Sequence, residues 1–296
     1  MDFLDYQRAV RDTDQTSGRA LTDMAVHLLG LTGEAGSVAT AYKKYLRDGD
    51  ADATYKLRLR EELGDVLWYV ATLADKLDLR LDEIAAANLD KTRSRWLPGS
   101  HECLDAEYPD TERLPRHGKY EFIPETSPTG QPRVRLFFDG QPAGDPLTDN
   151  RATEDGYRFH DVFHLAYATY LGWSPVTRAL LRRKRKSNPA VDENEDGGRA
   201  IVAEEGLSLF AFAYGAQHNH LDGVTRLDQQ LLDSITLMTN GLEVSARTHA
   251  DFEAAILQGH RVYRLLVQHG GGVVDFDADQ PSLAFRPLAP RILPSN

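Results

Sequence analysis

The chain has 296 residues, enough for two domains, since domains commonly run to roughly 100–200 residues. Its net charge of −11 argues against broad, sequence-independent binding to nucleic acid or to an anionic membrane, because both are polyanions. The single cysteine, Cys103, leaves no partner for an internal disulfide and favours a reducing cytoplasm. No run approaches the roughly 18 apolar residues of a membrane span. We expect a soluble, cytoplasmic protein.

Helical patterns fill the first third of the chain. Apolar residues recur at helical spacing there, and they predict helices near residues 3–12, 22–46, 55–77 and 81–96. The segment RDGDADAT, residues 47–54, breaks the pattern between the second and third helices. Pro98 and Gly99 follow the fourth, so we expect a helical domain over residues 1–97.

The rest of the chain is predicted to be mostly α with a small antiparallel sheet. Residues 98–118 contain three prolines and no clear periodicity, which is typical of a linker or of a segment that wraps around a domain in extended form. A domain over residues 119–296 would follow. Its two expected β-hairpins lie at 119–140 and 270–288, and its expected helices at 157–173, 175–183, 199–218, 225–246 and 249–269.

Acidic residues interrupt an apolar helix in LREELGDVLWYV, residues 59–70. Glu62 and Asp65 share a face with Val66, whereas Glu61 is turned about 100° aside. We interpret that face as interior. Burying two like charges one turn apart is costly unless a cation compensates, and carboxylate oxygens suit Mg²⁺. Spacing alone leaves open a solvated pair at a subunit or domain edge.

A third acid, Glu34, lies on the side of its helix that carries Leu31 and Val38, so it too is expected to face the core. Gly33 and Gly36 would allow another helix to approach closely. Three acids facing inward favour a metal site over a solvated surface.

Three segments of the first third resemble the MazG-like all-α nucleoside triphosphate pyrophosphohydrolases: GLTGEAGSVATAYKK, EELGDVLWYVATLADKL and LDEIAAANLDKTRSRW. That family carries E-x-x-E, E-x-x-D and N-x-x-K on successive helices. Matched residue by residue, these motifs fall on Glu34, on Glu62 with Asp65, and on Asn88 with Lys91. The second acid of the first motif falls on Ser37, a neutral and weaker Mg²⁺ ligand.

The resemblance implies cleavage of a (d)NTP to a (d)NMP and pyrophosphate, in a dimer or tetramer. Mg²⁺, or Mn²⁺, would be held by Glu34, Glu62 and Asp65 and would lower the pKa of the attacking water. Glu61 is either an assisting base or a surface residue. The alternative function, in view of Ser37, is a nucleotide-binding or regulatory protein without turnover.

Several side chains are candidates for contact with the substrate. The cations would meet phosphate oxygens, and the indole would stack on the base. The alternatives are a solvated charged face and ordinary core packing. The candidates are Asn88, Lys91, Lys43, Lys44, Arg95 and Trp68.

The second half offers another candidate metal site. FHDVFHLAY places His160, Asp161 and His164 within one helical turn or so, and Glu204 and Glu205 open an apolar helix about forty residues later. These residues could bind a second metal, line the first site or hold the catalytic centre. The alternative is that the histidines are hydrogen-bonded structural residues and the glutamates favour a helix start.

Two further features of this half are weaker signals. Both halves carry paired glutamates followed by a glycine, which suggests a diverged duplication, and the half as a whole resembles the helical extension of some bacterial MazG-like proteins. The basic run RRKRK, residues 182–186, precedes an acidic run, so we interpret residues 184–198 as a solvated loop.

Overall fold

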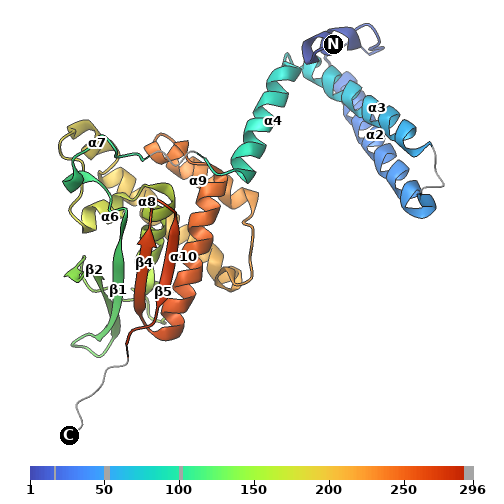
Figure 1. Ribbon diagram of the computed structural model, residues 1–296. Coiled ribbons are helices and arrows are strands. Elements are labelled where there is room, and N and C mark those ends of the chain that lie inside the picture. The colour runs from blue at the N-terminus through green and yellow to red at the C-terminus, as the bar shows by residue number, and fades with distance from the viewer. Residues whose placement is uncertain (17, 50–53, 100–102, 290–296) are drawn as a thin grey trace. The chain divides into compact units, whose positions relative to one another are not determined.

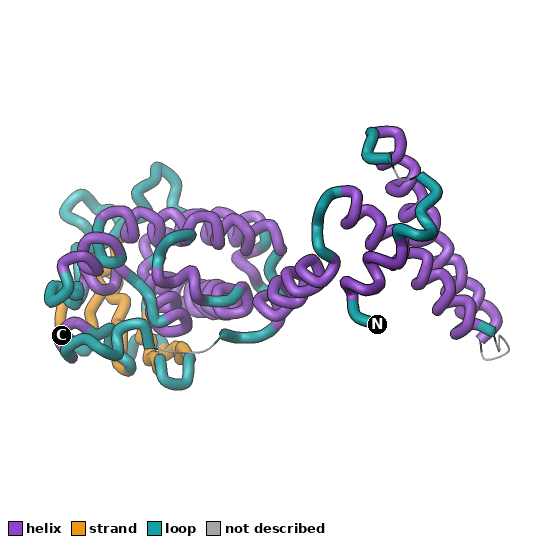
Figure 2. Tube along the Cα trace, turned by 90° about the horizontal axis from the view of Figure 1, so that it is seen from above, coloured by secondary structure: helices purple, strands orange, loops and turns teal. Residues whose placement is uncertain are grey.

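The computed structural model describes residues 1–16, 18–49, 54–99 and 103–289. The chain divides into two compact units, Met1–Arg93 and Ser94–Asn296, which we describe separately. Helices dominate both units, and the described strands form a five-stranded antiparallel sheet, which confirms the predicted mostly-α class (Figure 1, Figure 2). Among the described helices, none is both long and apolar enough to cross a membrane.

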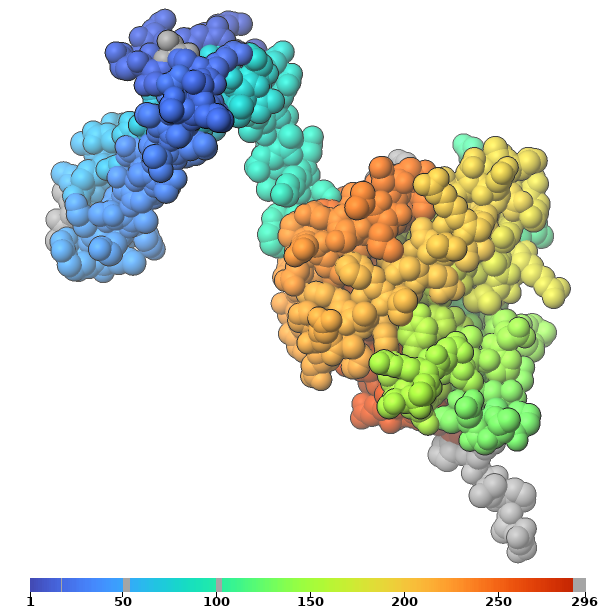
Figure 3. Space-filling model, turned by 180° about the vertical axis from the view of Figure 1, so that it is seen from behind, coloured from blue at the N-terminus to red at the C-terminus, as the bar shows by residue number. Residues whose placement is uncertain are grey.

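The described part of the first unit contains four α-helices close to those predicted: α1 (Phe3–Val10), α2 (Leu21–Asp48), α3 (Tyr55–Lys76) and α4 (Leu81–Trp96). The last residues of α4 belong to the second unit. Residues 50–53 of the predicted break lie outside the described residues. Helices α2 and α3 lie side by side (Figure 1, Figure 3). Glycine at position 30 is needed for this contact, because a Cβ there would collide with the ring of Tyr69.

The helical faces predicted to be interior are only half-buried in this chain, as Leu31, Val38 and Val66 show, and neighbouring leucines are more exposed. Leu29 is 73% exposed and Leu63 is 50% exposed. A Cβ added at Gly33 or Gly36 would meet no described atom within 4 Å, so the close helix approach expected at these glycines does not occur in the chain. A hairpin of two helices has one shared face to bury, and its remaining apolar side chains stay exposed.

The second unit is built around a sheet with strand order β3-β2-β1-β4-β5. The strands are β1 (His117–Thr126), β2 (Pro132–Phe138), β3 (Gln141–Pro142), β4 (Gly272–Asp277) and β5 (Ser282–Arg286). Both predicted hairpins are confirmed as antiparallel pairs. They are joined through β1 and β4, with Tyr120 opposite Val274, as the sequence suggested.

Helices α5 and α10 pack against each other and against strands of this sheet. The helices of the unit are α5 (Asp161–Leu171), α6 (Pro175–Leu180), α7 (Pro189–Asn194), α8 (Gly198–Gln217), α9 (Gln229–Thr239) and α10 (His249–His269). Ser174 caps α6 by accepting a hydrogen bond from the Thr177 amide. The helix expected at 225–246 ends early, because Gly241 takes a φ of +84°.

The segment predicted as a linker or wrap and the segment predicted as a solvated loop both contribute buried residues to the second unit. In the segment predicted as a linker, residues 100–102 lie outside the described residues, but Leu114 is 3% exposed and Asp105 pairs with Arg178 at 2.6 Å. The solvated loop expected at 184–198 contains α7. Its Arg185 is buried, and its guanidinium is paired with the buried carboxylate of Asp196.

Candidate functional site

Three carboxylates meet where α2 packs on α3. Glu34 projects from α2, and Glu62 and Asp65 project from α3 one turn apart. One oxygen from each lies within 4.8 Å of the other two. Glu34 and Glu62 are half-buried and Asp65 is exposed, so the cluster is open to solvent. Oxygen donors at this spacing suit a hard divalent cation.

The cluster lacks internal compensation for its charge. Within the described residues, none of the three carboxylates accepts a hydrogen bond or forms an ion pair. Burial and the charge of Asp65 together raise the pKa of Tyr6 on α1. All three carboxylates therefore keep lone pairs available to an external cation.

The other candidates from the first third lie apart from this cluster. Glu61 is exposed and is not among the clustered acids. The amide and ammonium candidates also have exposed side chains, on α2 for Lys43 and Lys44 and on α4 for Asn88 and Lys91. Within the described residues, no hydrogen bond or ion pair connects these four residues with the three acids.

Two predicted substrate contacts, Arg95 and Trp68, have partners within the described chain. Arg95 is 8% exposed, pairs with Glu253 at 3.0 Å and donates to the Leu227 carbonyl at 2.9 Å, so its guanidinium holds the second unit together. The indole of Trp68 donates to Thr13 Oγ1 at 2.8 Å and stacks on His27, which agrees with core packing rather than with an open platform for a base.

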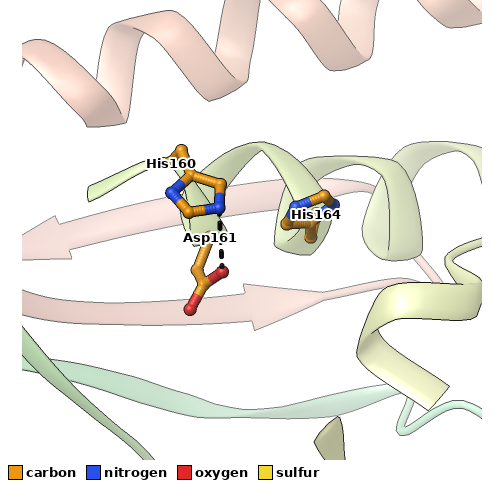
Figure 4. A group of neighbouring side chains, drawn as sticks. All are labelled: His160, Asp161 and His164. Atoms are coloured by element: carbon orange, nitrogen blue, oxygen red, sulfur yellow. Dashed lines mark ion pairs between the residues drawn. The ribbon is translucent and has the colours of Figure 1, made fainter. Parts of the chain in front are cut away.

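A second cluster lies at the start of α5. His160 caps the helix, Asp161 is its first residue and His164 follows one turn later (Figure 4). Ligand atoms of these three side chains lie within 4.8 Å of one another. His160 Nε2 is 3.7 Å from Asp161 Oδ1, and both side chains are about nine-tenths buried. The predicted i, i+4 pair of imidazoles therefore does share one face.

The two neighbouring glutamates of α8 have different roles. Glu204 is fully buried, and its oxygens accept hydrogen bonds from His164 Nδ1, Ser174 Oγ and the Val176 amide at 2.8, 2.6 and 2.8 Å. It therefore supports the cluster and is not a free metal ligand. The side chain of Glu205 is 43% exposed, with one oxygen 3.5 Å from His164 Nε2.

The electrostatics of this cluster favour a positive charge. Burial lowers the pKa of His164, but the charge of Glu204 and the contacts with both glutamates outweigh it and raise that pKa to about 10. Contact with His164 lowers the pKa of Glu205. Because α8 begins at Gly198, the glutamates do not lie at its first turn, and the predicted helix-start role is wrong.

Sequence reasoning missed two residues of this cluster. The ring of Tyr157 stacks on His160 at 4.3 Å, and its carbonyl oxygen lies 2.9 Å from His160 Nδ1. Tyr157 also lines a pocket of about 560 Å³. Ser174 caps α6, and its contact with Glu204 depends on tertiary packing that leaves no local sequence signal.

Comparison with known proteins agrees with both halves of the structure. Residues 24–96 match the model of the MazG nucleotide pyrophosphohydrolase domain, and residues 99–289 match that of the MazG C-terminal domain. The gene 37 protein of Mycobacterium phage L5 is 45% identical over 96 residues, which cover 30% of this chain and 84% of that protein. No solved structure matches the chain. The chain therefore belongs to the MazG family, with a MazG nucleotide pyrophosphohydrolase domain followed by a MazG C-terminal domain.

Proposed function

We propose that the N-terminal unit is a cytoplasmic, Mg²⁺-dependent hydrolase that cleaves a nucleoside triphosphate between the α and β phosphates. The observation that carries this proposal is the cluster of Glu34, Glu62 and Asp65, whose oxygens lie within 4.8 Å and are free of internal partners among the described residues. The family match supports the hydrolase class. The single cysteine supports a reducing compartment.

The donor set fits the proposed metal. Mg²⁺ and Mn²⁺ prefer oxygen ligands, and these three side chains offer only oxygens. When bound, the ion would polarise the phosphates and lower the pKa of the attacking water. Ser37 offers a hydroxyl where the family motif has a carboxylate, so one ligand position would be left to water or to substrate.

The protein itself would position the substrate and complete the site. The exposed ammonium groups of Lys43, Lys44 and Lys91 would contact phosphate oxygens, and Asn88 would hydrogen-bond phosphate or sugar oxygens. Since the described chain does not join Asn88 or Lys91 to the acids, we infer that a second copy contributes to the complete site.

The exposed apolar side chains of α2 and α3 support this assembly. Leu28, Leu29, Leu46, Leu57 and Leu63 are each about half-exposed or more, a surface that monomeric proteins rarely leave open. Two such hairpins would form a four-helix bundle and bury it. Leu29→Glu should therefore convert a dimer or tetramer into monomers, measured by light scattering after size exclusion, whereas Arg199→Glu on the second unit should not. Unchanged mass in both variants would contradict the assembly.

The activity is tested by incubating the full chain with a panel of NTPs and dNTPs plus Mg²⁺ and measuring pyrophosphate. Glu62→Gln and Asp65→Asn should each lower kcat/KM by more than about 100-fold, because even changes to groups that merely support a metal ligand cost 10–100-fold. Glu61→Gln is the matched control, and we expect a change of less than about threefold, since this side chain lies outside the cluster.

Two results would overturn the proposal in different ways. Nucleotide binding without pyrophosphate release, abolished by Glu62→Gln, would indicate a nucleotide-binding or regulatory protein without turnover. Loss of hydrolysis in His164→Ala but not in Asp65→Asn would place the catalytic centre in the second unit.

A further inference from the structure

Neighbouring groups fix the proton on each imidazole of the second cluster. His160 Nδ1 lies 2.9 Å from the Tyr157 carbonyl oxygen, which can only accept, so this nitrogen carries a hydrogen. His164 Nδ1 donates to Glu204 Oε1 at 2.8 Å. In the neutral form of each ring, the remaining lone pair is on Nε2, one of the two nitrogens through which histidine binds metals. An ion at His164 would displace the proton that the two glutamates otherwise stabilise on that ring, because a histidine ligand releases its proton when it binds a metal.

The second ring nitrogen of His164, Nε2, is buried without a hydrogen bond from the described residues. Its side chain is 1% exposed, yet within the described residues Nε2 has no hydrogen-bond partner. The carboxylate of Glu205 comes only to 3.5 Å. A buried polar atom without a partner is costly, and native proteins leave few of them. The buried Nε2 atom of His164 therefore indicates that a ligand completes the cluster.

The spacing of the surrounding atoms fits one ion. A tetrahedral ion with bonds of 2.0–2.1 Å holds its ligand atoms about 3.4 Å apart. His160 Nε2 is 3.7 Å from Asp161 Oδ1, and His164 Nε2 is 3.5 Å from Glu205 Oε2. Ligand atoms of His160, Asp161 and His164 all lie within 4.8 Å of one another, so small side-chain movements would enclose an ion.

Glu204 supplies the support that metal-binding histidines require. It orients His164 through Nδ1 and is itself fixed by Ser174 Oγ and the Val176 amide at the start of α6. A carboxylate behind the imidazole fixes the ring and makes it a stronger ligand. Because Glu204 is fully buried and its hydrogen bonds are made, this support exists before any ion arrives.

We propose that His160, Asp161, His164 and Glu205 form a binding site for a transition-metal ion of the Zn²⁺ class, separate from the acidic cluster of the N-terminal unit. Two imidazole donors favour such ions over Mg²⁺, which prefers an all-oxygen shell. The half-exposed side chain of Glu205 would close the site from the solvent side.

The test uses the full chain carrying Glu62→Gln and Asp65→Asn, so that the N-terminal cluster contributes no metal binding. The protein is stripped with a chelator and titrated with Co²⁺, followed by visible absorption, and then with Zn²⁺ in competition. We expect one ion per chain. The readout is binding alone, so it does not depend on whether the N-terminal unit hydrolyses nucleotides.

Glu205→Gln is the main variant, because its exposed position leaves the buried network intact. It should weaken Zn²⁺ binding at least about tenfold, and His164→Ala at least about 100-fold. His218→Ala is the matched control: this exposed histidine also has its Nδ1 beside a backbone carbonyl, that of Tyr214 at 2.7 Å, but lies outside the cluster.

His164→Ala also removes a hydrogen-bond partner of buried Glu204 and could destabilise the fold. Thermal unfolding of each variant therefore shows whether weaker Zn²⁺ binding comes from the missing metal ligand or from an unfolded chain. Failure of the parent chain to bind Co²⁺ at fixed stoichiometry would overturn the proposal. So would a folded Glu205→Gln chain that binds Zn²⁺ as tightly as its parent. In either case His164 is a structural imidazolium held between two carboxylates.

Discussion

Replacing Arg185 by alanine tests the buried ion network of the second unit. The guanidinium of Arg185 makes three hydrogen bonds to Asp196 and two to Glu243, and the side chain of Asp196 is fully buried. Removing one partner of such a pair costs about 3–5 kcal/mol, because the other charge stays buried. Glu243 is 19% exposed and Arg178 remains 3.5 Å from Asp196, which places the expected loss near 3 kcal/mol.

A loss of this size should lower the melting temperature by about 6–12 °C, at roughly 2–4 °C per kcal/mol for a unit of this length. Urea unfolding of the full chain, with hydrogen exchange to assign each transition to its unit, measures it. Lys186→Ala is the matched control: its side chain is 68% exposed, and loss of its ion pair with Asp192 should cost less than about 1 kcal/mol. Equal losses in the two variants would refute a buried role for Arg185.

Three other changes have defined outcomes. Gly30→Ala should destabilise the first unit by about 1–3 kcal/mol in urea unfolding, because the methyl group would collide with Tyr69, whereas Gly33→Ala, which meets open space, should not. Arg95→Ala should leave KM for nucleotide unchanged in the pyrophosphate assay and instead lower the stability of the second unit. Burial raises the pKa of Asp105, but its hydrogen bonds and the charge of Arg178 outweigh this effect and lower the pKa overall. The ionised carboxylate therefore stabilises the folded state above about pH 4, and this stabilisation is lost as the pH falls through the lowered pKa. In the Asp105→Asn variant, the free energy of unfolding should accordingly depend less on pH in that acidic range, as urea unfolding at a series of pH values would measure.

Helix positions were predictable because the signals that set them are local. The apolar period located α2, α3 and α4, and glycine or proline followed the ends of α2 and α4, so bounds agreed within about two residues. Helical spacing placed Glu62 and Asp65 on one face, whereas the meeting of Glu34 with Glu62 was implied by the family resemblance. The degree to which these acids are buried could not be predicted, because an apolar stripe on a helix does not show whether the surface that covers it belongs to the same chain.

Adjacent residues of like charge were the hardest to separate. Glu204 is fully buried and Glu205 is half-exposed, although nothing in the local sequence distinguishes these two adjacent glutamates. Arg185 is buried within a basic run because Glu243, far along the chain, supplies its counter-charge. Such differences arise from tertiary contacts, and no pattern within a short window carries them.

The sheet of the second unit also sets an order of folding. Strand β1 pairs with β4, and Tyr120 lies opposite Val274, about 150 residues later in the chain. The hydrogen bonds between these two strands can therefore form only after β4 has been synthesised. The contacts that define the first unit lie within residues 1–93. During synthesis the first unit can fold early, whereas the apolar face of α5 stays uncovered until α10 has been made. Slow translation or a shortage of chaperones should therefore cause aggregation through the second unit while the first is already native.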